Sequence, residues 1–494
     1  MAIAVGAPSA QCQTWRFEPG VNLQETLTDN VNLQPSGLAK ADLVTEITPT
    51  LHITEKSSHT SLNGTVALQS LLYARTGAEN NQIYPVANLV GDVDFFDRRF
   101  VVEGEVIASQ QFFSPFGAQP INIANATQNR YTSVTYRVSP YFQGVTPGNL
   151  SYLLRNNSTW TNLSNTPIQT NNSYTSEWVG RIESARVPLG WSADMDLTNV
   201  KFNNQAPQKT NLGRVSAHYD YNEQLHFRAD VGYEDNQYPL SSSSGAIYGV
   251  GFEWRPSART SANVNWEQRF FGSSYLVTFD HRTPLSTWNF SASRNITSYP
   301  QQLASLPAGN VQGLLNQLFL SRIPDPAQRQ TAIDSLIQSQ GLPANLTSPV
   351  NLYSQQILLA ENASASVGIL GARNSVLISL YYLREQPINA AGNVLPPILS
   401  NANNDTTQLG VGAIWTHNLT STATMNLSIN GSQSKLNAPL TGKTNTASIR
   451  LGVTQPISPR TTVFAGARYQ VSRGDLAADY NEAAIFAGLN YAFK

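Results

Sequence analysis

Apolar and polar residues alternate with a period of two along most of this chain. Residues 225–234 read Leu-His-Phe-Arg-Ala-Asp-Val-Gly-Tyr-Glu, and the odd-numbered positions are apolar throughout. Because successive side chains of a strand point to opposite faces, this segment predicts a strand with one apolar and one charged face. About 22 such segments follow one another from about Thr14 to Phe493, each near ten residues long.

Two all-β architectures can use such strands. A soluble sandwich covers the apolar faces with a second sheet, whereas a membrane barrel turns them to lipid and lines a watery interior with the polar faces. The connections favour the barrel, because short links alternate with long polar ones. Short links include 188–190, 222–224 and 256–258, and the long ones are 28–40, 114–128, 157–171, 236–243 and 386–404. An up-and-down outer-membrane barrel has short turns at one rim and long loops at the other.

The composition agrees with a barrel. Charged residues make up 13% of the chain, about half of the ~25% found in globular domains. The net charge of -1 gives no reason to expect nucleic acid as a partner. No apolar run approaches the ~18 residues of a spanning helix, and the eight tryptophans lie mostly near expected strand ends, as in interfacial girdles. We therefore predict a transmembrane, antiparallel, up-and-down β-barrel of about 22 strands in a bacterial outer membrane.

The two ends of the chain carry weaker signals. Residues 1–12 are predicted to be a residual signal or N-terminal tail ahead of a barrel spanning 13–494, since Ala-Pro-Ser-Ala before Gln11 resembles the end of a secretory signal. Cys12 is the single cysteine, which excludes an internal disulfide, and an incidental cysteine fits better than lipid attachment.

The last expected strand runs from Ala484 to Phe493 and ends Gly-Leu-Asn-Tyr-Ala-Phe. This glycine and paired-aromatic ending resembles the C-terminal signal read by the bacterial barrel-assembly machinery. Phe486 departs from that pattern because a polar residue is usual there, and Lys494 follows the terminal aromatic residue.

One segment, 298–350, changes to helical spacing. Val311 begins one apolar stripe, and Asp325-Pro326 supplies a cap and a first-turn proline for a second helix. The expected lid side chains are Leu314, Leu315, Leu318, Phe319, Ile333, Leu336 and Ile337. Strand parity puts this insert on the side of the long loops. Folding into the barrel mouth as a lid or constriction is the first hypothesis, and packing on the rim or against a partner is the second.

Twelve charged residues on neighbouring strands are predicted to line the interior. They are Arg214, His218, Asp220, His226, Arg228, Asp230, Glu253, Arg255, Glu267, Arg269, Asp280 and Arg282. Interleaved charges of this kind predict lateral ion-pair ladders that keep a wide wall rigid. The sharper interpretation is that the mixed polar interior handles a hydrated solute such as a polysaccharide.

The chemistry of catalysis has little support in the sequence. His218 and His226 could join Asp220 and Asp230 in a hydrolytic or metal site, but the chain has no Gly-x-Ser-x-Gly and no His-Glu-x-x-His motif. Carboxylates two residues apart, such as Glu103 and Glu105, arise on any polar strand face. We therefore predict no catalytic residue, no metal ligand and no cofactor.

Three segments carry a family resemblance. Trp15-Arg16-Phe17-x-Pro19, the run 321–329 (Ser-Arg-Ile-Pro-Asp-Pro-Ala-Gln-Arg) and the run 383–387 (Leu-Arg-Glu-Gln-Pro) are similar to stretches of the outer-membrane β-barrel family associated with the PEP-CTERM/exosortase system. The resemblance implies a Gram-negative outer membrane and a setting beside exopolysaccharide production and protein sorting. It supplies no active-site residues.

These features lead to three functional hypotheses. The first is a passive channel or export pore linked to exopolysaccharide or envelope biogenesis. The second is a structural or docking barrel for surface assembly, with loops such as 114–128 as contacts, and the weakest is an outer-membrane hydrolase. The expected partners are outer-membrane lipid or lipopolysaccharide, the barrel-assembly machinery, and an exopolysaccharide or a periplasmic export component.

Overall fold

The computed structural model describes most of the chain. The described residues are 14–164, 172–203, 206–238, 241–303, 357–388, 405–437, 441–476 and 479–493, with 311, 315, 316, 319, 320, 323, 329, 333, 348–351, 354 and 356 in the insert. The N-terminal tail and the lid residues Leu314, Leu318, Leu336 and Ile337 lie outside the described residues.

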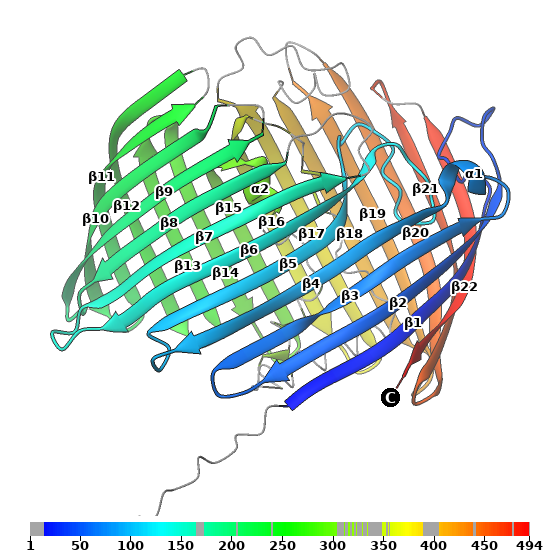
Figure 1. Ribbon diagram of the computed structural model, residues 1–494, viewed down its shortest axis with the longest axis horizontal. Coiled ribbons are helices and arrows are strands. Elements are labelled where there is room, and N and C mark those ends of the chain that lie inside the picture. Colours follow the sequence, from blue (N-terminus) through cyan, green and yellow to red (C-terminus); the bar gives the residue numbers. More distant parts are fainter. Residues whose placement is uncertain are drawn as a thin grey trace, which may run out of the picture.

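The described residues form one antiparallel sheet of 22 strands, in which each strand pairs with the next along the chain. The first strand, β1 (Thr14–Thr28), also pairs with the last, β22 (Tyr480–Ala492), and this pairing closes the sheet into a barrel (Figure 1). A closed sheet has no unpaired edge, so its backbone polar groups are satisfied even where no water is available. The predicted fold class is confirmed.

The intervening strands are β2 (Asp42–Lys56), β3 (Thr60–Tyr73), β4 (Gln82–Phe95), β5 (Phe100–Phe112), β6 (Arg130–Val145), β7 (Ser151–Ser164), β8 (Ser173–Glu183), β9 (Leu189–Phe202), β10 (Gln208–Asn222), β11 (Leu225–Tyr238), β12 (Ser241–Ser257), β13 (Thr260–Arg269), β14 (Gly272–Arg282), β15 (Ser286–Ser298), β16 (Ile357–Leu370), β17 (Asn374–Pro387), β18 (Thr406–Asn418), β19 (Thr424–Leu436), β20 (Gly442–Ser458) and β21 (Thr461–Gly474). Two short helices, α1 (Gly77–Asn80) and α2 (Tyr299–Leu303), follow β3 and β15.

The two ends of the barrel differ. Because the strand number is even, β1 begins and β22 ends at the same end, and the turns there are short, such as 223–224 and 459–460. We call this the turn end. The opposite end carries the connections 29–41, 113–129 and 299–356, and we call it the loop end (Figure 1).

The period-two pattern determines which side chains face outward. On β11, Phe227, Val231 and Tyr233 are exposed on the outside, whereas Asp230 and Glu234 are buried on the inside. All eight tryptophans are at least one-third exposed and belong to the outer, apolar surface. None of the helices within the described residues has the length and apolarity needed to span a membrane.

Two expected loops were placed wrongly. The segment 157–171 was expected to be a loop, but β7 continues to Ser164. The segment 236–243 was also expected to be a loop, yet Asn236 pairs with Ser243 across β11 and β12. Polar alternating residues extend these ladders beyond the apolar band, so the loss of apolar residues does not mark the end of the strand. Since β13 and β14 are also joined only by Phe270 and Phe271, the alternation of short and long links is not strict.

Candidate functional site: the barrel interior

The predicted lumen-lining residues lie on β10 to β14, at positions opposite in parity to the outward apolar side chains, and Leu276 of β14 shares their inward parity. On β10 and β11, His226 Nδ1 lies 2.7 Å from Asp220 Oδ1, and Arg228 Nε lies 3.3 Å from Asp230 Oδ1. Arg214 forms an ion pair with Glu267. The structure therefore brings most of these charges together as cation–carboxylate pairs along the wall.

One pair on this wall, Arg269 with Glu234, is buried. Arg269 donates to both carboxylate oxygens of Glu234, with the shortest distance 2.5 Å between Arg269 Nη2 and Glu234 Oε2. The two side chains are 5% and 0% exposed. Arg269 Nη1 also donates to Asn295 Oδ1 at 2.7 Å.

The other predicted residues lie nearer the turn end. Arg255 pairs with Glu253 and is mostly exposed. Asp280 accepts a hydrogen bond from Asn289 Nδ2 at 2.6 Å, and Arg282 Nη2 donates to the carbonyl of Ala258 at 3.0 Å.

The same ladder continues on β5 to β9. Glu105 pairs with Arg137 and Glu103 pairs with Arg155, so the two carboxylates considered as a catalytic pair are each neutralised by an arginine. Arg181 Nε lies 3.5 Å from Asp194 Oδ1. This arrangement supports the interpretation as lateral ion pairs that stiffen the wall.

Three strands of the opposite wall, β16, β18 and β19, are uncharged on the inside. In β16, β18 and β19 every inward position carries an uncharged residue, for example Ser364 on β16 and Asn426, Ser428 and Asn430 on β19. The interior therefore combines ion pairs on β5 to β13 with an uncharged stretch on β16, β18 and β19, whereas Glu385 of β17 and the Arg468–Glu482 pair of β21 and β22 are charged.

Two connections fold into the barrel interior, and we call them the inward segments. The first is the connection 113–129 between β5 and β6. Asn125 is completely buried, donates to Glu482 Oε1 at 3.1 Å, and accepts from Arg468 Nη2 at 3.0 Å. Glu482 also accepts from Thr28 Oγ1 at 2.7 Å and from Arg468 at 2.9 Å. These contacts bind the segment to β1, β21 and β22 from the inside.

Apolar contacts hold the same segment at a second place. Ala124 packs in a buried cluster with Val31, Val44, Leu71, Tyr73 and Tyr84, and Ile123 lies against it. The sequence predicts this connection only as a long polar loop, because no local pattern distinguishes a loop that folds inward. Phe116 and Asn125 of this connection are enclosed, whereas Ile121 is exposed, and the hypothesis that the connection offers contacts to a partner stays a prediction.

The second inward segment is the insert. Val311, Leu315 and Ile333 are buried against Leu377 of β17 and Ile414 of β18, with Phe319 and Leu370 beside them. Leu377 and Ile414 lie in the half of their strands nearer the turn end and face inward. The described lid residues Leu315, Phe319 and Ile333 therefore lie deep inside the barrel.

Polar contacts also connect the insert to the wall. Gln302 Nε2 donates to Glu385 Oε1 at 2.6 Å, and the amide and carbonyl of Val350 make hydrogen bonds of 2.9 and 2.8 Å with the Gln408 side chain. Glu385 and Gln408 are both 1% exposed. The insert is thus fixed at its start, its middle and its end.

The two inward segments meet. Phe113 and Tyr131, which flank the connection 113–129, form a buried cluster with Tyr299 and Leu303 of α2. Phe113 and Tyr131 have ring centroids 4.4 Å apart. The connection 113–129 and α2, which start from opposite sides of the barrel, therefore contact each other in the interior near the loop end.

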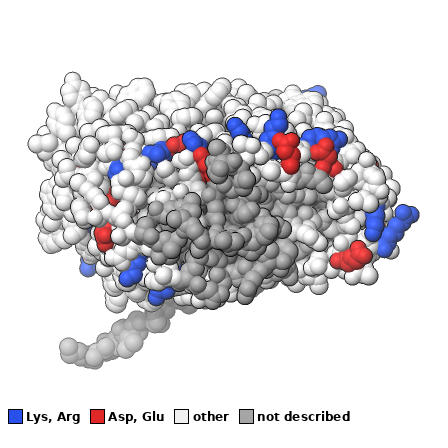
Figure 2. Space-filling model, turned by 90° about the horizontal axis from the view of Figure 1, so that it is seen from above, with Lys and Arg blue, Asp and Glu red and all other residues white. Residues whose placement is uncertain are grey.

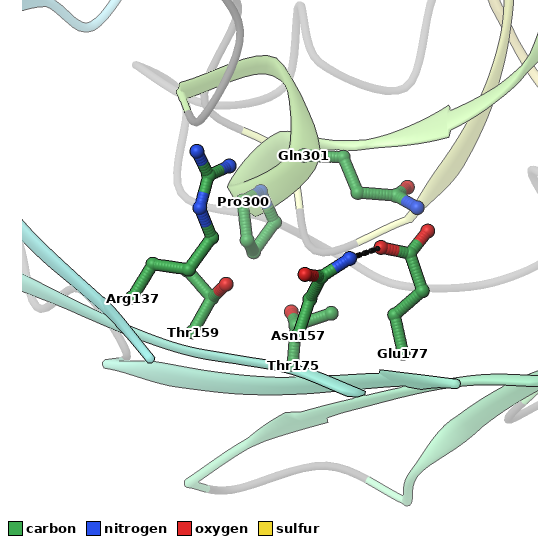
Figure 3. Close-up of a pocket in the computed structure, with 7 residues that line it drawn as sticks. All are labelled: Arg137, Asn157, Thr159, Thr175, Glu177, Pro300 and Gln301. Carbon is green, nitrogen blue, oxygen red and sulfur yellow. Dashed lines mark hydrogen bonds between the residues drawn. The ribbon is translucent and has the colours of Figure 1, made fainter. Parts of the chain in front are cut away.

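A polar cavity of about 250 Å³ remains between α2 and the charged wall. It is lined by Arg137, Asn157, Thr159, Thr175, Glu177, Pro300 and Gln301. Figure 3 shows side chains of β6, β7 and β8 on one side, Pro300 and Gln301 on the other, and the 2.7 Å hydrogen bond from Asn157 to Glu177. Its lining of amides, hydroxyls and opposite charges suits hydrated polar groups.

The histidines do not form an accessible hydrolytic site. His218 Nε2 lies 3.0 Å from Ser192 Oγ, but Ser192 is completely buried and His218 nearly so. Asp194 contacts Ser192 and not His218. A serine nucleophile needs an approaching substrate and a base oriented by a third group. Within the described residues, no three His, Cys, Asp or Glu side chains gather as metal ligands.

The closed sheet, the apolar outer surface and the ion-paired interior define the class of this protein. It is an integral β-barrel protein of the bacterial outer membrane, because only a closed barrel lets strands cross lipid without unsatisfied backbone groups.

No family model and no curated protein matches the chain. Among solved structures, it is similar to the siderophore receptor PirA from Acinetobacter baumannii, with 8% identity, a TM-score of 0.48, and coverage of 96% of this chain and 80% of that one. It is also similar to OpdK from Pseudomonas aeruginosa, solved with vanillate, with 6% identity, a TM-score of 0.37, and coverage of 97% and 99%. At these values the likeness carries no argument about function.

Proposed function

We propose that this protein is an outer-membrane channel or export pore for hydrated polar solutes, with a bore narrowed by the connection 113–129 and the insert. The observation that carries the proposal is the contact between these two segments inside the barrel, through Phe113, Tyr131, Tyr299 and Leu303. The lumen of a barrel of 22 strands is wide, so segments inside it are needed if passage is to be restricted.

The polar interior supports a sugar-like solute. One wall offers serine, threonine and asparagine groups, and the other offers arginines and carboxylates that already neutralise each other. Such walls exchange hydrogen bonds with a hydrated chain without holding a free ion tightly. Together with the sequence resemblance, this supports a role in exopolysaccharide export within a PEP-CTERM/exosortase setting, beside a periplasmic export component.

Single-channel conductance in planar bilayers tests the proposal. Replacing 302–349 by a short Gly/Ser linker is expected to raise the conductance several-fold, because the insert no longer occupies the lumen. The matched control replaces the connection 475–479, which lies at the same end between β21 and β22, and should leave the conductance unchanged.

A second variant keeps the chain length. Ile414→Asn removes the apolar surface on which Val311, Leu315 and Ile333 pack, and it should produce frequent transitions to a larger conductance. Thr416→Asn, on the same strand face, is its control. If removal of the insert leaves the conductance unchanged, the proposal that the insert narrows the channel is wrong.

A further inference from the structure

The outer surface at the loop end carries a pair of opposed lysines. Lys435 of β19 and Lys443 of β20 are Cα partners in the sheet, and both are exposed. They share the outward parity of Ile429 and Ile449, which are partners lower on the same two strands. Like charges placed directly opposite each other destabilise a strand pair, so barrel stability gives no reason for this arrangement.

The lysines have no carboxylate partner among the described residues. Arg473, on the neighbouring strand β21, lies 3.8 Å from Asp479. Other outward arginines at this end are paired more closely: Arg294 Nε lies 2.9 Å from Glu361, and Arg384 Nη2 lies 2.6 Å from Asp405. Figure 2 shows such cationic and anionic groups side by side along the rim of this end. Neither lysine forms an ion pair with a described residue, and the neighbouring Asp475 is joined to Lys443 through the backbone, its N–H donating to the Lys443 carbonyl at 2.9 Å.

Two further exposed lysines lie diagonally across a strand pair on the other side of the barrel. Lys209 of β10 is the partner of Asn199 on β9, and Lys201 lies two residues beyond Asn199 on the same outer face. Both lysines are exposed, and neither forms an ion pair with a described residue. The strands β10 and β20 are ten positions apart in a ring of 22, which is about halfway round.

The height of these lysines matches a lipid headgroup. Leu409 of β18, which is 53% exposed on the outer surface, is the Cα partner of Gln433. Lys435 lies two residues beyond Gln433, which at about 3.3 Å per residue and a tilt near 40° is about 5 Å further along the membrane normal. The lysines therefore lie just outside the apolar band. Gln433 and Asn445, which are hydrogen-bonded at 2.7 Å, separate the apolar side chains from the lysines.

The chain uses lysine and arginine for different purposes. Of its seven lysines, four form these two outward pairs, whereas the pairs on the inner wall use arginine. The planar fork of arginine binds carboxylates and phosphates alike, and the compact ammonium of lysine also binds phosphate, as a point charge.

We propose that Lys435 with Lys443, and Lys201 with Lys209, each bind a phosphate group of a phosphorylated glycolipid of the outer leaflet, of the lipopolysaccharide type. The apolar strands below each pair would contact the acyl chains of the same molecule. This site depends on the outer-membrane location and is independent of whether the barrel conducts.

Binding of purified lipopolysaccharide to the detergent-solubilised barrel tests the proposal. We expect native mass spectrometry to show bound glycolipid on the wild type, less on Lys435→Gln/Lys443→Gln, and almost none when Lys201→Gln/Lys209→Gln is added. The apparent affinity of the quadruple variant should fall at least tenfold. Lys40→Gln/Arg75→Gln removes the same charge as the first double variant from connections at the loop end, and should bind as the wild type does.

Two further arms identify the source of the phosphate. Dephosphorylated lipopolysaccharide should bind weakly, and inorganic phosphate should not raise the thermal unfolding midpoint as lipopolysaccharide does. Undiminished glycolipid binding by the quadruple variant would overturn the proposal, and so would an equal stabilisation by inorganic phosphate. If the glutamine variants fail to fold, the arginine replacements Lys435→Arg/Lys443→Arg keep the charge and should retain binding.

Discussion

At the scale of single residues, glycines allow long side chains to lie flat on the inner wall. A Cβ on Gly232 would stand 2.7 Å from Arg214 Cβ, and one on Gly249 would stand 2.8 Å from Glu267 Cγ. Arg214 on β10 therefore reaches Glu267 on β13 across two intervening strands. An ion pair over this distance depends on the bare backbone between its partners.

Phe486 shows the complementary use of glycine. The sequence marked it as a departure from the usual terminal strand, and in the barrel it is buried on the inner side. Its ring lies beside the glycine partners Gly452 and Gly466, and the Arg450 guanidinium carbon stands 4.6 Å from its centroid. An aromatic ring that covers glycine backbone pins the register of neighbouring strands.

Gly466→Ala is expected to destabilise the barrel. The added Cβ would stand 2.6 Å from Phe486 Cζ and would also overlap the backbone carbonyl of Leu451, which cannot move freely. Overpacking of this kind costs about 1–3 kcal/mol. The thermal midpoint, followed by the gel mobility of the heated barrel, should fall by several degrees. Gly213→Ala, where a Cβ meets nothing within 4 Å, should leave the midpoint unchanged.

At the scale of elements, the connection 113–129 is held by buried charge. Glu482 is completely buried and accepts hydrogen bonds from Thr28, Asn125, Arg468 and Gln470. One carboxylate thus joins β1, β21, β22 and an inward loop. This makes the loop part of the wall near the loop end.

Glu482→Ala should release that loop. Removing one member of a buried ion pair costs about 3–5 kcal/mol, because Arg468 is left charged and without its carboxylate. Limited proteolysis of the folded variant should then cut within 113–129, where the wild type resists. Glu253→Ala breaks the more exposed pair with Arg255 and should produce no new cleavage. An uncut loop in Glu482→Ala would show that the apolar cluster around Ala124 suffices.

At the scale of the whole molecule, the barrel has two distinct ends. Long connections usually face the cell exterior in this class, with short turns in the periplasm. The termini at the turn end agree with that orientation.

Cysteine labelling of intact cells checks the orientation. In a Cys12→Ser background, Glu79→Cys in α1 at the loop end should react with a membrane-impermeant maleimide, and Arg259→Cys in the turn before β13 should not. Labelling of both sites after cell lysis is the control. The reverse labelling pattern in intact cells would show that the loop end faces the periplasm.

The sequence by itself determined the strands, their number and the side each residue faces. Alternation is a local property: the parity of Phe227 and Asp230 follows from the pleat of β11 alone, whatever the neighbouring strands are. The same reasoning placed Arg214, Asp230 and Glu267 on one side. It was less successful at strand ends such as 236–243, because polar alternation continues there without apolar residues.

Only the tertiary structure decided which charges pair and where the long segments go. Arg214 and Glu267 meet because three strand registers and two glycines align them. Asn125 donates a hydrogen bond to Glu482, which is 357 residues away in the chain, and Leu315 packs against Leu377 and Ile414 on the inner wall. The inward direction of a loop depends on groups offered by distant strands, and a pattern of neighbouring residues holds no information about those groups.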